Sequence, residues 1–166
     1  DESVFVNPII CSKEAKENLE KHLLLLYTGL TRSSVRILSE QKNNTERHED
    51  KRQTLRNMVK LARELRDALT QNELNSFGEI LHAGWLEKKK MASNISNSKI
   101  DEWYEIARKH GAIGGKILGA GGGGFFLFYA TPEKHENIIR ALPELRQTPF
   151  RFEPQGSKII YVEENE

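Results

Sequence analysis

Glycine is the residue type whose placement in this chain points most directly to chemistry. Eight of the twelve glycines fall within residues 111–124. Because glycine has no side chain, a run of glycines lets backbone N–H groups approach a bulky anion such as a phosphate. Such a run loses much conformational entropy on folding, so a functional reason is expected. The apolar residues 125–130 follow directly and are typical of a buried strand. The segment therefore predicts a phosphate-binding loop held by a strand.

The glycine run does not fit three common nucleotide-binding loops. Gly119, Gly121 and Gly124 match the dinucleotide-binding pattern, but that pattern must lead into a helix. A Walker A loop needs Ser or Thr after Gly-Lys, whereas Ile117 follows Lys116. Protein kinases share the strand–glycines–strand order, but their other conserved segments are absent from this sequence. A glycine-rich hairpin without a ligand stays open as an alternative, although a hairpin turn requires only one or two glycines.

Composition and charge exclude several classes of function. The 166 residues fit one domain, and the net charge of +1 gives no reason to expect nucleic acid or a membrane surface as partner. No apolar run approaches the ~20 residues of a membrane span. The single cysteine, Cys11, excludes an internal disulfide, and with no visible signal peptide it favours the cytoplasm. The five histidines lack metal-ligand spacing, so no metal site is expected.

Periodicity and capping residues predict alternating groups of helices and strands. Ser12 should cap a helix over residues 13–21, which a buried strand over residues 22–28 follows. Four helices are expected next, the first with Val35, Ile37 and Leu38 inward and the second with an inward stripe that includes Leu55 and Val59. Further strands are expected at 115–118, 124–130, 150–152 and 157–162, and a helix that begins at residues 131–132 should lie between the second and third of these.

This order of elements predicts the fold class. Strand, helices, strand, strand, helix and strand make the split βαββαβ pattern of ferredoxin-like folds, with extra helices in the first crossover. We therefore expect an α+β two-layer sandwich whose antiparallel sheet carries helices on one face. Lys88, Lys89 and Lys90 fall in the last turn of a helix, where cations suit the helix dipole. An anion site is the alternative for these lysines.

Two segments resemble a known family. Residues 116–124, Lys-Ile-Leu-Gly-Ala-Gly-Gly-Gly-Gly, resemble the third motif of the GHMP kinases (galactokinase, homoserine kinase, mevalonate kinase and phosphomevalonate kinase). Residues 25–34, Leu-Leu-Tyr-Thr-Gly-Leu-Thr-Arg-Ser-Ser, are similar to sugar kinases of the D-glycero-D-manno-heptose 7-phosphate group. The resemblance covers nearly the whole chain but only the C-terminal half of the family. It implies that residues 1–166 form a single C-terminal domain of this type, and the start at Asp1 instead of Met agrees with a fragment.

The resemblance also implies a function and a set of site residues. The parent enzyme would transfer a phosphoryl group from ATP to a sugar or sugar phosphate, with ATP and Mg²⁺ bound mainly by an N-terminal nucleotide-binding domain that this chain lacks. The chain alone would be inactive and would hold no catalytic residue. The residues near the phosphates or the nucleotide loop would be Lys116, Gly119, Ala120, Gly121, Gly122, Gly123 and Gly124. The acceptor would be bound by Thr28, Gly29, Thr31 and Arg32, because an arginine matches a phosphate dianion.

Other functions stay open at this point. One alternative is a ferredoxin-like module that binds a small ligand or regulates without catalysis. The related mevalonate diphosphate decarboxylases share the same superfamily but differ in chemistry. We further expect an exposed apolar face where the N-terminal domain would dock, and this face could instead support a homodimer.

Overall fold

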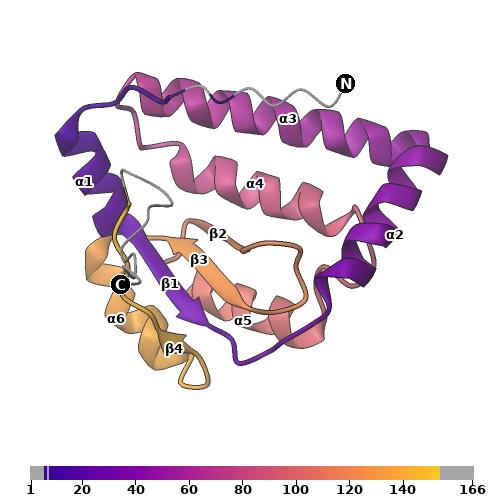
Figure 1. The fold of residues 1–166 in the computed structure, drawn as a ribbon. Coiled ribbons are helices and arrows are strands. Elements are labelled where there is room, and N and C mark those ends of the chain that lie inside the picture. Colours follow the sequence, from indigo (N-terminus) through magenta and orange to yellow (C-terminus); the bar gives the residue numbers. More distant parts are fainter. Residues whose placement is uncertain (1–5, 7, 154–166) are drawn as a thin grey trace, which may run out of the picture.

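The sheet of this protein has the strand order expected for a ferredoxin-like fold. The structure, a computed structural model, describes Val6 and residues 8–153 (Figure 1). Four strands, β1 (Leu23–Tyr27), β2 (Gly114–Ile117), β3 (Phe125–Tyr129) and β4 (Arg146–Gln147), form one sheet in the order β2-β3-β1-β4. All three neighbouring pairs are antiparallel. β3 lies between β1 and β2, as in a split βαβ unit, so the predicted α+β fold class is confirmed.

The helices occupy the positions that the sequence predicted. The chain contains α1 (Lys13–His22) before β1, then α2 (Ser34–Arg47), α3 (Glu49–Thr70), α4 (Phe77–Lys89) and α5 (Ser98–Lys109) between β1 and β2, and α6 (Pro132–Ala141) between β3 and β4. Figure 1 shows α3 and α4 stacked beyond β2, and α2 standing beside the loop that joins β2 to β3. The first crossover of the fold is thus expanded into four helices. The first of them, α2, lies beside the glycine loop.

Capping residues explain where two of these helices begin. The Ser12 side chain accepts a hydrogen bond from the backbone N–H of Ala15 at 3.0 Å, as predicted for the start of α1. At α5 the cap is Asn97, one residue before the helix begins at Ser98. Its side-chain oxygen accepts hydrogen bonds from the N–H groups of Lys99 and Ile100, both at 3.0 Å. The cap of α5 therefore lies in the segment that reaches the glycine loop.

The two faces of the sheet are covered to different extents. Leu24, Leu26, Phe126 and Phe128 are completely or almost completely buried and belong to the core that α5 and α6 complete. On the opposite face, Leu23 and Tyr129 are buried in a second cluster, whereas Leu25, Tyr27, Phe125 and Leu127 are only half-buried. This alternation follows from the two-residue period of a strand. It leaves the end of the sheet nearest the glycine loop open on one face.

The last predicted strands require a correction. The fourth strand is β4, which the sequence analysis missed because two exposed residues give no hydrophobic alternation. Residues 150–152 do not form a strand; Phe150 and Phe152 instead pack against the second core cluster. The predicted strand over residues 157–162 lies outside the described residues.

The inward side of α2 also differs from the prediction. Ile37 is buried, with 2% of its surface exposed, but Val35 is 75% exposed and Leu38 is 51% exposed. Successive residues of a helix point about 100° apart, so a helix that touches its neighbours along one narrow side buries few of its apolar residues. On α3, Leu55 and Val59 are likewise exposed instead of inward. The outer sides of α2 and α3 therefore present apolar side chains at the surface.

Candidate functional site

The glycine loop, residues 118–124, has a backbone conformation that requires glycine. Its φ angles are +76° at Gly119, +111° at Gly121, +75° at Gly122, +151° at Gly123 and +87° at Gly124. Residues with a side chain rarely adopt such angles. The loop leaves β2 with a hydrogen bond from the N–H of Leu118 to the carbonyl of Phe125 at 2.8 Å. Its glycines are thus part of a defined conformation.

Two of the glycines pack against the chain itself. A Cβ atom at Gly121 would lie 2.8 Å from the Cα and carbonyl oxygen of Ile95, and one at Gly123 would lie 2.5 Å from the carbonyl oxygen of Leu30. Both distances are too short for a side chain. The missing side chains at these two positions are therefore required by packing within the protein.

Gly119 and Gly124 differ from their neighbours in the loop. A Cβ atom at either position would meet no atom within 4 Å. Gly119 is exposed and Gly124 is half-buried. If glycines of this loop allow a ligand to come close, the open space is at these two positions. Ala120 between them is half-buried and packs against the first core cluster.

Thr28 holds the loop from the end of β1. Its hydroxyl donates to the carbonyl of Gly124 at 2.8 Å and accepts a hydrogen bond from the N–H of Leu30 at 3.2 Å. The N–H of Thr28 donates to the same carbonyl at 2.9 Å, and the N–H of Gly124 donates to the carbonyl of Leu30 at 2.8 Å. Thr28 is 5% exposed. The Thr28 hydroxyl is thus engaged inside the protein, where it fixes the glycine loop to the end of β1, and its predicted contact with an acceptor stays a prediction.

A second segment, residues 93–97, supports the loop from the other side. The N–H of Gly122 donates to the carbonyl of Ile95 at 2.8 Å. The segment is tied to α2 because the Glu40 carboxylate accepts hydrogen bonds from the N–H of Ser93 at 2.7 Å and from its hydroxyl at 3.2 Å. These bonds from Ser93 hold the pKa of the Glu40 carboxyl below its ordinary value. Glu40 is thereby linked to the glycine loop through Ile95.

A hollow of about 360 Å³ opens where α2, residues 94–97 and Gly122 meet; we call it the arginine hollow. Arg32 and Arg36 line it, and neither guanidinium makes a hydrogen bond or contact ion pair with another residue that the structure describes. Its remaining lining residues are Ser33, Ile37, Asn94, Ser96, Asn97 and Gly122. None of these lining residues is acidic. Arg32 thus lies against Gly122 of the glycine loop, and its role in binding an acceptor stays a prediction.

The start of α2 adds to the positive character of the hollow. Ser33 is the N-cap residue but makes no side-chain capping bond, and the first turn of α2 contains no acidic residue. The first N–H groups of a helix carry partial positive charge and bind anions when nothing else satisfies them. Two guanidinium groups and this helix start together favour a phosphate or carboxylate.

Three of the other polar side chains of the hollow are already engaged. Asn97 caps α5, and the hydroxyl of Ser96 donates to Asp101 at 2.9 Å. The Asn94 amide donates to the Ser93 hydroxyl at 3.1 Å. The groups left for a ligand are therefore chiefly Arg32, Arg36, the Ser33 hydroxyl and the N–H groups at the start of α2.

The sequence analysis missed Arg36. One signal could have found it, because a spacing of four residues from Arg32 places two side chains on the same side wherever a helix extends over both. In the structure Arg32 lies just before α2. Asn94 and Ser96 gave no signal, because their position depends on how the connection between α4 and α5 folds back onto the loop. Of the other predicted acceptor residues, Gly29 and Thr31 are exposed next to Arg32 in the chain but do not line the hollow.

The arginine hollow does not suit Mg²⁺. Magnesium is held by carboxylates and other hard oxygen ligands, whereas this hollow is lined by cations and by no acidic side chain. Within the residues that the structure describes, no group of three or more His, Cys, Asp and Glu side chains could hold a metal ion. No described helix has the length and apolar character to cross a membrane.

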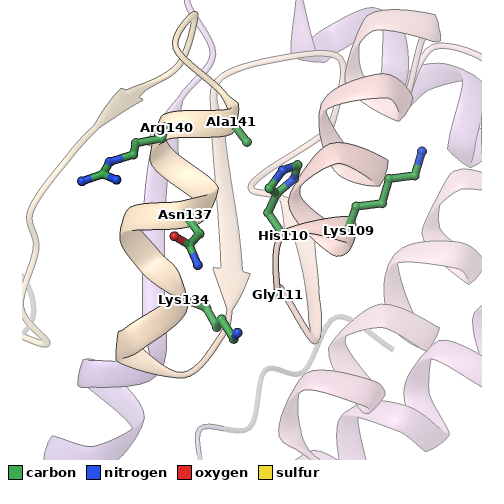
Figure 2. A pocket seen from close by; sticks show the side chains of 7 residues that line it. All are labelled: Lys109, His110, Gly111, Lys134, Asn137, Arg140 and Ala141. Atoms are coloured by element: carbon green, nitrogen blue, oxygen red, sulfur yellow. The ribbon is translucent and has the colours of Figure 1, made fainter.

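A second hollow, of about 530 Å³, lies between the end of α5 and α6 (Figure 2). It is lined by Lys109, His110, Gly111, Lys134, Asn137, Arg140 and Ala141. In Figure 2 the side chains of Lys109 and Arg140 extend away from one another, out of the space between the helices. Cations at the end of α5 also suit its dipole. This hollow lies at the opposite end of α5 from Asn97, roughly 18 Å away at about 1.5 Å per residue, so it is not part of the glycine-loop site.

Comparison with known proteins shows the family of this chain. The family described as "GHMP kinases C terminal" matches residues 58–146, just over half of the chain. A D-glycero-alpha-D-manno-heptose 7-phosphate kinase of Campylobacter jejuni is 30% identical over 157 residues, which is 93% of this chain and 46% of that protein. The chain thus spans slightly less than half of this relative.

Solved structures give the same result. A structure described as a putative sugar kinase from Campylobacter jejuni superimposes with a TM-score of 0.61 at 25% identity, over 93% of this chain and 43% of that one. The L. major mevalonate kinase, solved in complex with R-mevalonate, has a TM-score of 0.68 at 19% identity, over 75% of this chain and 40% of that chain, and so supports the fold alone. The glycine loop, the fold and the matched sequence agree, and the chain belongs to the GHMP kinases, with the fold of their C-terminal domain.

Proposed function

We propose that this chain is the C-terminal domain of an ATP-dependent kinase that transfers a phosphoryl group to a sugar phosphate. The observation that carries the proposal is the arginine hollow next to Gly122. Arg32 and Arg36 supply planar donor groups matched to a phosphate, and the start of α2 adds N–H groups without an acidic competitor. The relative named as a heptose 7-phosphate kinase supports a phosphorylated acceptor.

In this proposal the chain contributes position and charge. Phosphoryl transfer depends mostly on aligning donor and acceptor and on neutralising the phosphate charges. Arg32 and Arg36 bind the acceptor phosphate, and Gly119 and Gly124 leave room for the reacting groups. Thr28 fixes the glycine loop relative to β1. Lys116, on β2 just before the glycine loop, and Ala120, within the loop, lie near the phosphates. The catalytic base, and the main contacts to ATP and Mg²⁺, belong to residues outside this chain.

The proposal includes a partner domain. Residues 1–166 act as one C-terminal domain, and an N-terminal nucleotide-binding domain covers the exposed side of α2. Val35 and Leu38 support this, since they are large apolar residues exposed close to the arginine hollow. Without that domain the chain is inactive, and the same apolar side could pair two copies of the chain. We place the kinase in the cytoplasm, in line with the single cysteine.

The experiment compares this chain with its parent polypeptide, meaning this chain together with the residues proposed to precede it. A coupled assay follows ADP release with ATP, Mg²⁺ and a panel of heptose, mannose and fucose derivatives, each with and without a phosphate. The parent should turn over a sugar phosphate, and the chain alone should show no turnover. If the parent binds sugar phosphates but releases no ADP, a binding or regulatory module is the better assignment. If only unphosphorylated acceptors react, the assignment of the arginine hollow is wrong.

A further inference from the structure

Three consecutive lysines end α4, and one of them differs from the other two. Lys89 forms an ion pair with Asp101 at 3.0 Å, and Lys90 forms one with Glu87. Lys88 has no carboxylate within ion-pairing distance among the described residues; its Nζ donates to the Gln41 side-chain oxygen at 3.3 Å. Lys88 and Lys89 lie in the last turn of α4 and Lys90 is its C-cap residue, so the predicted position at the helix end is confirmed, but Lys88 differs in having no acidic partner among the described residues.

The surroundings of Lys88 contain further donors. Burial and the nearby ammonium of Lys116 both lower the pKa of Lys88, burial more strongly. The side-chain nitrogen of Gln41 is buried and has no hydrogen-bond partner in the described structure. The Lys88 ammonium and the Gln41 amide are therefore hydrogen-bonded neighbours, the Lys116 ammonium lies near enough to act on Lys88, and no acidic side chain is among the groups that shift the pKa of Lys88. A half-buried cation without a counter-ion is unfavourable unless an anion binds there.

Lys88, Lys116 and Gln41, which we call the lysine cluster, lie near the glycine loop. Lys116 lies on β2 two residues before the loop begins, and α4 packs closely on β2. Gln41 lies eight residues after Ser33 in α2, roughly 12 Å along the helix axis at about 1.5 Å per residue. The lysine cluster and the arginine hollow are therefore two separate groups of cationic side chains, and the glycine loop connects them.

We propose that Lys88 and Lys116, with the Gln41 amide, bind the phosphate chain of the nucleotide that donates the phosphoryl group. This inference rests on the proposed function and deepens it. Transfer between two phosphorylated ligands requires a cationic binding site for each of them. The arginine hollow supplies one site and the lysine cluster supplies the other. Lys88 then neutralises part of the donor's charge from the C-terminal domain, while Arg32 and Arg36 bind the acceptor.

The test uses Lys88→Met, which keeps the length of the side chain, and Lys90→Met as a matched control in the same helix turn. In the parent polypeptide, Lys88→Met should raise the KM for ATP about tenfold, as expected for loss of a charged hydrogen bond, and leave the KM for the sugar phosphate nearly unchanged. Lys90→Met should change neither value. The arginine variant Arg32→Ala should show the reverse pattern.

A binding measurement on the chain itself separates this inference from the proposed function. Titration with inorganic tripolyphosphate, followed by calorimetry, should show binding that Lys88→Met weakens about tenfold and Lys90→Met retains. The pKa of the Lys88 ammonium, measured by NMR, should rise when tripolyphosphate is added. Equal tripolyphosphate affinity in all three proteins overturns the inference, as does a Lys88→Met effect confined to the sugar phosphate. A parent without kinase activity overturns the proposed function, while the titration still decides whether the two lysines bind a phosphate chain.

Discussion

The hydroxyl of Thr28 donates a hydrogen bond of 2.8 Å to the carbonyl of Gly124, although 96 residues separate them in the chain. This bond joins the end of β1 to the end of the glycine loop. It places Arg32, which follows Thr28 by four residues, next to a loop that is formed much later in the sequence. The site is thus assembled by the pairing of two strands, and its precision depends on that junction.

The first prediction concerns this junction. Thr28→Val keeps the shape of the side chain but removes the hydroxyl, so the N–H of Leu30 loses its acceptor and the Gly124 carbonyl loses one of two donors. We expect the free energy of unfolding to fall by about 1–2 kcal/mol. Chemical denaturation of the chain measures this. Thr28→Ser, which keeps the hydroxyl, should lose clearly less; equal losses would show that the methyl group and not the hydrogen bond is responsible.

The second prediction separates two kinds of glycine in the loop. Gly123→Ala places a methyl group 2.5 Å from a backbone oxygen of Leu30, whereas Gly119→Ala places one in open space. We expect Gly119→Ala to cost about 1–2 kcal/mol, from its positive φ alone, and Gly123→Ala to cost more. Thermal unfolding of the two variants measures the difference. If Gly119→Ala were the more destabilising, the conformation described for the loop would be incorrect.

The contacts of each glycine also decide which position best tests the approach of a ligand. A bulky residue at Gly121 would lower stability, because it would collide with the backbone of Ile95. It would therefore not test a ligand role cleanly. Gly119→Val in the parent polypeptide should reduce kcat by a larger factor than it reduces the folded fraction, since only the positive φ and the approaching ligand oppose it. Loss of activity in proportion to loss of folded protein would argue against a ligand at this position.

The third prediction concerns Arg36. It lines the arginine hollow and is exposed, so Arg36→Ala should change the free energy of unfolding by less than about 0.5 kcal/mol. In the parent polypeptide it should raise the KM for the sugar phosphate about tenfold. Steady-state kinetics and denaturation on the same preparation measure both values. Arg47→Ala, at the far end of α2, is the control and should leave the KM unchanged.

The fourth prediction concerns pH and Glu40. The pKa of Glu40 is lowered by the hydrogen bonds from Ser93, so its contribution to stability is present above its ordinary pKa of about 4.5 and is lost as the pH falls through the lower folded value. Glu40→Gln should therefore be less stable than the original chain at pH 7, and the gap should close below about pH 4.5. Denaturation between pH 7 and pH 3 measures the gap. Glu46→Gln, an exposed carboxyl of the same helix, should show a smaller gap throughout.

Much of the fold could be predicted because local rules and tertiary structure agree. Ser12 and Pro132 mark helix starts that the structure confirms, and the apolar run of residues 125–130 contains β3. The predicted burial of helix residues was wrong where it depends on how the helices pack against the rest of the protein. Val35 and Leu38 are apolar but face outward, because α2 contacts the rest of the protein along one side only. β4 has two residues, too few for any periodic signal.

The site could be predicted in part. The glycine run and Arg32 could be singled out as candidate site residues from the sequence, because residues of these types are unusual at such positions. Arg36 and residues 94–97 could not be predicted as parts of the site. They come together only through strand pairing and through the way the connection between α4 and α5 folds. Lys88 shows the same limit: three adjacent lysines are equivalent in sequence, and only the structure shows that two of them have acidic partners.

The most direct test of the central claim is the acceptor dependence of Arg32→Ala in the parent polypeptide. The rate of ADP release is measured with a sugar phosphate and with the same sugar without its phosphate. If the arginine hollow binds the acceptor phosphate, Arg32→Ala should lower kcat/KM for the sugar phosphate about tenfold or more and leave the unphosphorylated sugar almost unaffected. An equal loss with both acceptors, or no loss with either, would contradict the account.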